Sequence, residues 1–119
     1  MKRSKTNPAI INLISELKEK SFEKNAPIWK DLSKRLEKPN RGYAEANLSK
    51  IDRMTDHDDV VVVVGKVLGA GKLTHKVTIS ALNFSQRAKE KIETVGGGCL
   101  TLSELAEEFP LGTNVKIIG

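Results

Sequence analysis

The chain has 119 residues and a mass of 13.1 kDa, which predicts one domain with its own core. Its 20 lysines and arginines exceed its 15 aspartates and glutamates, giving a formal net charge of +5. No apolar run approaches the roughly 18 residues of a membrane span, and the charged first residues contain no signal-peptide core, so we expect a cytoplasmic protein without membrane contact. Its single cysteine, Cys99, excludes a disulfide framework and a multi-cysteine zinc site.

Residues 1–6 are predicted to form a basic arm. Lys2, Arg3 and Lys5 all precede the first acidic residue of the chain, Glu16. An unopposed basic terminus is a recurrent feature of nucleic-acid contact. The alternative is a solvated terminus whose charge only keeps the chain soluble.

Residues 7–37 are predicted to form two antiparallel helices. Asn7 and Pro8 are a helix start, with asparagine as the N-cap and proline at the first helical position, and residues 25–27 repeat that signal. Apolar residues at helical spacing follow each start: Ile10, Leu13, Ile14 and Leu17, then Ile28, Trp29, Leu32 and Leu36. We expect the first helix over about 8–21 and the end of the second near Pro39.

Residues 38–59 are predicted to form an irregular basic segment followed by an exposed acidic turn at 56–59. Pro39 and Gly42 interrupt regular structure, and a short strand or turn is expected around 47–53. The segment carries residue types that hydrogen-bond phosphates or stack on bases. These residues are Asn40, Arg41, Tyr43, Asn47 and Lys50. A plain linker is the alternative interpretation.

Residues 60–119 are predicted to form an α/β core. Five consecutive valines, Val60 to Val64, indicate a strand buried on both faces. The glycine-rich stretch that follows at 65–72 is predicted to be a loop that turns the chain after this strand. Residue patterns predict strands at 77–81, near 99–100 and at 115–117, a helix after Ser85, and another helix behind a capping box at 101–104. Such alternation favours parallel pairing through crossovers. The predicted fold class is α/β: a small irregular mixed sheet with packed helices, preceded by the basic arm and the helical pair.

The chain lacks the patterns of a nucleotide, metal or catalytic site. In the glycine-rich stretch, Lys66 and Ala70 stand where a phosphate-binding P-loop needs glycines, and Leu73 replaces its Ser or Thr. The aspartates at 56–59 lack the glycine of a calcium loop, and the two histidines lie far apart in the sequence. Cys99, beside a predicted strand, is interpreted as a packed thiol. We expect no enzyme activity, cofactor, metal or small-molecule substrate.

Positive charge is concentrated in the first half of the chain. Residues 1–53 hold thirteen basic and seven acidic residues, a net charge of +6. Residues 54–119 hold seven basic and eight acidic residues, a net charge of −1. The sequence therefore directs the search for an anionic partner to the arm, the helical pair and the segment after them.

A group of motifs spread over the whole chain carries a family resemblance. They are Lys5-Thr6-Asn7-Pro8, Ile28-Trp29-Lys30-Asp31-Leu32, Arg35 to Pro39, Ala44-Glu45-Ala46-Asn47-Leu48-Ser49-Lys50-Ile51-Asp52-Arg53, Val60 to Val63, Gly65 to Gly69, Val77-Thr78, Phe84-Ser85 and Val115 to Gly119. Together they resemble the large-subunit ribosomal protein eighteen-e family of archaea and eukaryotes, which is related in fold to ribosomal protein fifteen. The compact length is similar to that of archaeal members. The chain departs from the family pattern at Asn40 and Tyr43, where basic residues are usual.

The resemblance implies a structural component of the large ribosomal subunit that supports subunit assembly and translation. Its partners would be ribosomal RNA and neighbouring ribosomal proteins, and its affinity for RNA would come from phosphate neutralisation. The candidate RNA-binding residues are Lys2, Arg3, Lys5, Lys38, Asn40, Arg41, Tyr43, Asn47, Lys50, Arg53, Lys66 and Lys72. Each has a structural alternative: Asn47 caps a turn, Tyr43 packs internally, and the surface lysines only aid solubility.

Two other classes of function remain open from the sequence. A protein-interaction module would dock a non-ribosomal partner through the apolar faces of its helices, and its complex would survive about 1 M salt far better than a phosphate interface. A small enzyme would use Cys99 or a histidine, and Cys99→Ser would then abolish its function.

Overall fold

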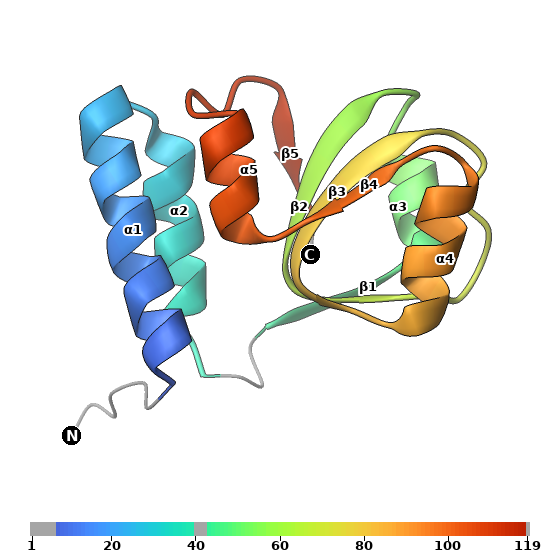
Figure 1. The fold of residues 1–119 in the computed structure, drawn as a ribbon, viewed down its shortest axis with the longest axis horizontal. Coiled ribbons are helices and arrows are strands. Elements are labelled where there is room, and N and C mark those ends of the chain that lie inside the picture. Colours follow the sequence, from blue (N-terminus) through green and yellow to red (C-terminus); the bar gives the residue numbers. More distant parts are fainter. Residues whose placement is uncertain (1–6, 40–42, 119) are drawn as a thin grey trace.

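The computed structural model describes residues 7–39 and 43–118, and Figure 1 shows their arrangement. The five helices are α1 (Pro8–Lys24), α2 (Pro27–Leu36), α3 (Leu48–Met54), α4 (Gln86–Thr94) and α5 (Leu102–Glu108). The five strands are β1 (Ala44–Asn47), β2 (Asp59–Leu68), β3 (Val77–Phe84), β4 (Gly98–Leu100) and β5 (Val115–Ile117). The predicted α/β class is confirmed.

The predicted helical pair is present, and its first helix begins as expected. The Asn7 side chain accepts a hydrogen bond from the Ala9 amide at 2.9 Å, with Pro8 in the first turn. Helix α1 continues to Lys24, three residues beyond the predicted end. It stops because Asn25 adopts a left-handed conformation with φ of 51°, and Pro27 then begins α2. The second helix differs at its start: Asn25, predicted as an N-cap, is the C-cap of α1, and Ala26 is the N-cap of α2 without a side-chain hydrogen bond.

Strand β2 is the centre of the sheet. Strand β3 pairs with one edge of β2, and β4 continues the sheet beyond β3. The other edge is divided, because β5 pairs with Val60–Val62 and β1 pairs with Gly65–Leu68. All four pairings between described strands are parallel, where a mixed sheet was expected, because each connection crosses over through a helix or through residues 69–76.

The glycine-rich stretch does not begin a loop at Gly65, as the sequence suggested. Gly65 continues β2 as far as Leu68, and the loop starts at Gly69. A Cβ atom at Gly65 would lie 1.8 Å from the carbonyl oxygen of Ala44 on β1. Glycine therefore lets β1 approach β2, and the register between β2 and β3 shifts at this point.

The run of valines serves two hydrophobic clusters on opposite faces of the sheet. Val61 and Val63 pack with residues of α3 and α4, whereas Val62 and Val64 pack with residues of α1, α2 and α5. Figure 1 shows α1, α2 and α5 on one side of β2 and α3 and α4 on the other. The prediction of a strand buried on both faces is confirmed.

The segment expected to be irregular contains regular structure in its second half. Residues 44–47 form β1 and residues 48–54 form α3, where the sequence suggested at most a short strand or turn. Leu48 and Ile51, one helical turn apart, are fully buried against the sheet. Tertiary packing therefore stabilises a helix of only seven residues, which is too short to be stable alone.

Candidate nucleic-acid interface

Five of the twelve predicted RNA-binding residues lie outside the described residues. They are Lys2, Arg3 and Lys5 of the basic arm and Asn40 and Arg41 after the second helix. The other seven candidates form a first group of two between α2 and β1 and a second group of four at the other end of β1, with Lys66 on β2 beside β1.

The first group is the pair Lys38 and Tyr43, between α2 and β1. Lys38 is exposed immediately after the helix. The Tyr43 hydroxyl donates a hydrogen bond to the Leu36 carbonyl at 2.7 Å, and its ring packs against the cluster beneath α1 and α2. Tyr43 therefore fixes the path of the chain from α2 to β1, in agreement with the packing alternative.

The second group begins with Asn47, the last residue of β1, and with Lys50 and Arg53 of α3. Asn47 is the N-cap residue, but its side chain makes no capping hydrogen bond and it is exposed. The alternative that Asn47 acts as a side-chain cap is therefore not observed. Lys50 and Arg53 are three residues apart, so they lie on neighbouring parts of one helical surface.

Lys66 lies on β2 rather than in a glycine loop. It is exposed, and in the parallel pairing it lies opposite Glu45 of β1. The two side chains stand on the same face of the sheet. Glu45 reduces the positive potential around Lys66, which makes Lys66 a weaker phosphate-binding candidate than Lys50 or Arg53.

Lys72 lies in the loop 69–73, which rests between α3 and α4. The Lys91 ammonium of α4 donates to the carbonyl oxygens of Gly69 and Gly71, at 2.7 and 2.8 Å. The Ser49 amide of α3 donates to the carbonyl oxygen of Ala70 at 3.2 Å. A Cβ atom at Gly71 would lie 2.4 Å from Cβ of Ser49, and the φ of Gly71 is +87°. The two helices therefore hold the loop closely.

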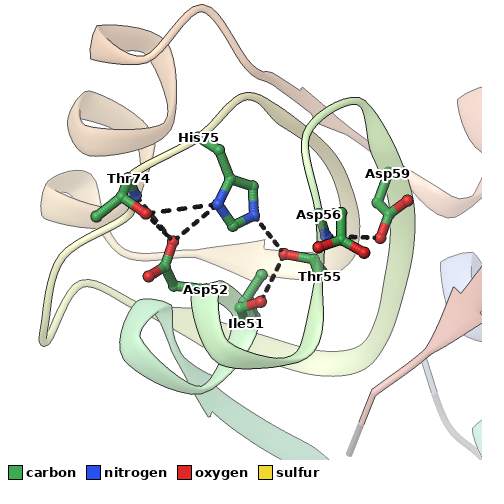
Figure 2. A network of polar contacts seen from close by, with 7 residues as sticks. All are labelled: Ile51, Asp52, Thr55, Asp56, Asp59, Thr74 and His75. Carbon is green, nitrogen blue, oxygen red and sulfur yellow. Dashed lines mark hydrogen bonds and ion pairs between the residues drawn. The ribbon is translucent and has the colours of Figure 1, made fainter.

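A polar network continues this attachment toward β3 (Figure 2). Asp52 of α3 accepts hydrogen bonds from the amide and the hydroxyl of Thr74, both at 2.8 Å. The His75 ring lies between Asp52 and Thr55. Its Nδ1 is 3.2 Å from the Asp52 carboxylate, and its Nε2 is 2.8 Å from the Thr55 hydroxyl. The Thr74 hydrogen bonds lower the pKa of Asp52, with a smaller contribution from His75. The network fastens residues 74–75 to α3.

Sequence reasoning missed the basic residues of α4. Arg87, Lys89 and Lys91 are in the half of the chain whose net charge is −1, so the overall count concealed them. Helix α4 also approaches the loop closely at Gly69. A Cβ atom added to Gly69 would lie 2.7 Å from the Cβ atom of Arg87. The signal that could have identified this region is the pair of glycines at 69 and 71, because glycine permits close backbone contact with a neighbouring element.

Several basic residues at other places are neutralised by carboxylates. The ion pairs are Lys18–Glu37, Arg35–Asp31, Lys76–Asp58 and Lys116–Asp59. Among the residues that the structure describes, Lys50, Arg53, Lys72 and Arg87 form no ion pair. Some lysines of α1 and α2 share this property. What distinguishes the second group is that α3, the loop 69–73 and α4 meet there.

Cys99 and the acidic turn are the places where the sequence offered a candidate nucleophile or metal ligands. Burial raises the pKa of the Cys99 thiol, and nearby Glu93 raises it further, which opposes the thiolate form. Within the described ranges, no group of three or more His, Cys, Asp or Glu residues is arranged to hold a metal ion. In the same ranges no helix is sufficiently long and apolar to span a bilayer.

Comparisons with known proteins cover almost the whole chain. The family model described as "Ribosomal protein 60S L18 and 50S L18e" matches residues 4–119. Large ribosomal subunit protein eL18 of Methanothermobacter thermautotrophicus is 53% identical over 98% of this chain and 97% of its own length. The eL18 proteins of Methanococcus maripaludis and Halobacterium salinarum are 52% and 44% identical, over 96% and 97% of this chain and 95% and 98% of their own. The chain therefore belongs to the ribosomal protein family of 60S L18 and 50S L18e.

Proposed function

We propose that this chain is a structural component of the large ribosomal subunit in the cytoplasm, where it binds ribosomal RNA and has no catalytic duty. It would support subunit assembly and translation by fixing RNA segments and by contacting neighbouring ribosomal proteins. Membership of the eighteen-e family supports the placement in the large subunit. The relatives, which are large ribosomal subunit proteins, support extending this placement to the present chain.

The observation that carries RNA binding is the meeting of three basic elements at one edge of the sheet. Strands β1 and β2 end beside each other, since Asn47 pairs with Leu68. Helix α3 begins directly after β1 and the loop 69–73 directly after β2. The start of α4 lies beside them, because the Ser85 amide donates a hydrogen bond to the Val67 carbonyl at the end of β2. These elements carry exposed cations such as Lys72 and Arg87. Neither side chain forms an ion pair with a carboxylate of the described residues, so both can displace counterions from phosphates.

RNA shape, rather than base sequence, would determine the site. Lysine and arginine contacts to phosphates carry no base information. Double-stranded RNA is recognised mostly through backbone shape and 2′-hydroxyl groups. Asn47 adds a free amide side chain that can donate to a phosphate or to a 2′-hydroxyl.

The alternative of a docking module loses its main support in the structure. The apolar residues that suggested free helix faces, Leu17, Trp29, Leu32 and Leu36, are fully buried inside the protein. They pack against the sheet and α5 and are not available to a partner. Ile11 and Phe22 are the large apolar side chains of α1 that are exposed.

Sedimentation of native cell extract through salt gradients tests the proposed function. We expect this chain to migrate with large subunits in stoichiometric amount at moderate salt and to be released only at high salt. A large-subunit protein of unrelated surface charge in the same fractions is the control for recovery. If the chain is found only in the soluble fractions, the ribosomal proposal is wrong.

A further inference from the structure

The loop 69–73 has an unusual distribution of hydrogen bonds. Three consecutive carbonyl groups, those of Gly69, Ala70 and Gly71, each accept a hydrogen bond from α3 or α4. The amide groups of Ala70, Gly71 and Lys72 have no acceptor among the described residues. All three of these residues are exposed.

Peptide geometry relates these two facts. In a trans peptide the carbonyl of one residue and the amide of the next point in opposite directions. Because the carbonyls at 69–71 point to donors within the protein, the amides at 70–72 point away from those donors. The carbonyls of Gly69 and Gly71 share the donor Lys91, so the amides of Ala70 and Lys72 both point away from Lys91 and can bind one anion together. The Gly71 amide points away from a different donor, the Ser49 amide of α3.

Lys91 of α4 orients the loop by binding its carbonyl groups on the side opposite to the free amides. Its ammonium group binds two carbonyl oxygens of the loop and is itself partly buried. Lys72 lies on the loop itself, and the neighbouring Lys50 and Arg87 have no ion-pair partner in the part of the chain that the structure describes. The hydrogen bonds from Thr74 and Gln86 leave the negative charges of Asp52 and Glu90 in place. Helix α3, the loop 69–73 and helix α4 together nevertheless carry six basic residues against three acidic residues. The local charge therefore favours an anion.

We propose that the amides of Ala70 and Lys72 and the Lys72 side chain bind a phosphate group of the ribosomal RNA backbone, and that Lys91 is the positioning residue that holds the loop in the binding conformation. This inference rests on the proposed function, since it specifies which part of the RNA the interface recognises. It also distinguishes two roles for lysine: Lys72 contacts the phosphate, and Lys91 orients the groups that do.

Amide NMR with inorganic phosphate tests the site directly in the full chain. We expect saturable shifts of the amides of Ala70 and Lys72. The variant Lys91→Met keeps the aliphatic stem but loses the two carbonyl contacts, and should abolish the shifts while the amides of β2 and β3 keep their positions. Lys76→Ala removes an exposed lysine of the same connection and is the matched control, with wild-type behaviour expected.

Binding to transcribed large-subunit ribosomal RNA tests the same roles in the complex. Lys72→Ala should lower the affinity about fivefold and lower the slope of log K against log salt by about 0.7–0.9, which corresponds to one phosphate contact. Lys91→Met should produce a similar loss through displacement of the loop. Gly71→Ala, which removes no charge and introduces a clash with Ser49, should also lower the salt slope.

The outcomes separate this inference from the proposed function. If the wild-type amides do not respond to phosphate, or if Lys91→Met binds RNA as tightly as Lys76→Ala does, the phosphate site is wrong and RNA binding at other residues stands. If acetate at equal ionic strength shifts the same amides as strongly, the loop binds a carboxylate of a protein partner and the phosphate assignment is wrong. If wild-type protein does not bind the RNA at all, the proposed function itself fails.

Discussion

At the scale of single residues, charge alone does not identify an RNA contact. Lys18 and Lys116 are exposed and basic, but each is held by a carboxylate at 2.9 and 2.8 Å respectively. A lysine that already has such a partner gains less from a phosphate, because the existing pair must be separated first. Lys50 and Arg53 have no such pair in the described structure, so they are the stronger candidates.

The first prediction concerns Lys50 and Arg53. Replacing both by alanine should weaken binding to large-subunit ribosomal RNA and lower the slope of log K against log salt by about 1.4–1.8, at about 0.7–0.9 per lost phosphate contact. Filter binding over a range of salt concentrations measures both quantities. The control is Lys34→Ala, an exposed lysine on α2, and an unchanged slope in the double variant would show that neither side chain contacts phosphate.

The second prediction concerns the enzyme alternative. Cys99→Ser should leave ribosome association and RNA affinity unchanged, because the thiol is partly buried and its raised pKa keeps it protonated. The stability cost should be small, about 1 kcal/mol or less, since the site is only partly buried. Loss of function in a variant whose far-ultraviolet circular dichroism and melting temperature are normal would restore Cys99 as a reactive group.

At the scale of elements, side-chain hydrogen bonds replace the helix that usually connects parallel strands. The crossover from β2 to β3 is the loop 69–76, which has no regular structure. It is fastened by Lys91 at one end and by Asp52 at the other, and Leu73 is buried between them. The stability of this connection should therefore depend on the ionisation of Asp52.

The third prediction follows from the lowered pKa of Asp52. A carboxyl group whose pKa is lower in the folded than in the unfolded state stabilises the fold above the unfolded pKa, about 3.9. That stabilisation is lost as the pH falls through the folded pKa, so it should decrease between about pH 5 and pH 2. Asp52→Asn keeps the shape and removes the titration, and should flatten the decrease in the urea midpoint over this range.

The control for this effect is Asp31→Asn, which removes a carboxylate from an exposed i, i+4 pair with Arg35. Its urea midpoint should retain the wild-type dependence on pH, because exposed helical pairs contribute little. Identical pH profiles for Asp52→Asn and wild type would mean that the Thr74 contacts do not stabilise the ionised form.

At the scale of the whole molecule, the sequence predicted elements with strong local signals and missed those that depend on tertiary contacts. The caps at Asn7 and Thr101 and the run of valines identified α1, α5 and β2 because their signals lie within a few residues. Helix α3 was missed because it has only two buried positions, Leu48 and Ile51, whose value depends on the sheet above them.

The candidate site divides in the same way. Lys50 and Lys72 could be selected from residue type and family motif, although they are 22 positions apart. That α4 supports the loop of Lys72 could not be predicted, because Lys91 contacts the backbone carbonyls of Gly69 and Gly71, which lie 22 and 20 positions away in the sequence. Sequence patterns report such contacts only indirectly, through glycines that permit close approach.

The last prediction concerns the two hydrophobic clusters, which share β2 and should therefore unfold together. Val63 belongs to the cluster beneath α3 and α4, whereas the single tryptophan, Trp29, belongs to the cluster beneath α1 and α2. Val63→Ala should reduce the free energy of unfolding by about 2 kcal/mol through lost burial and a residual cavity. Neighbouring valines of one strand contribute to both clusters. The urea midpoint measured by Trp29 fluorescence should therefore shift as far as the midpoint measured by circular dichroism.

Urea unfolding followed by both signals measures this coupling, and Val62→Ala on the Trp29 face is the matched variant. Coincident transitions in wild type and both variants indicate one cooperative unit, as expected for a domain of this size. A fluorescence transition that stays at its wild-type midpoint in Val63→Ala would instead show that the helical pair unfolds independently of the α3–α4 face. In that case the interface formed by α3, the loop and α4 could be altered without changing the helical pair.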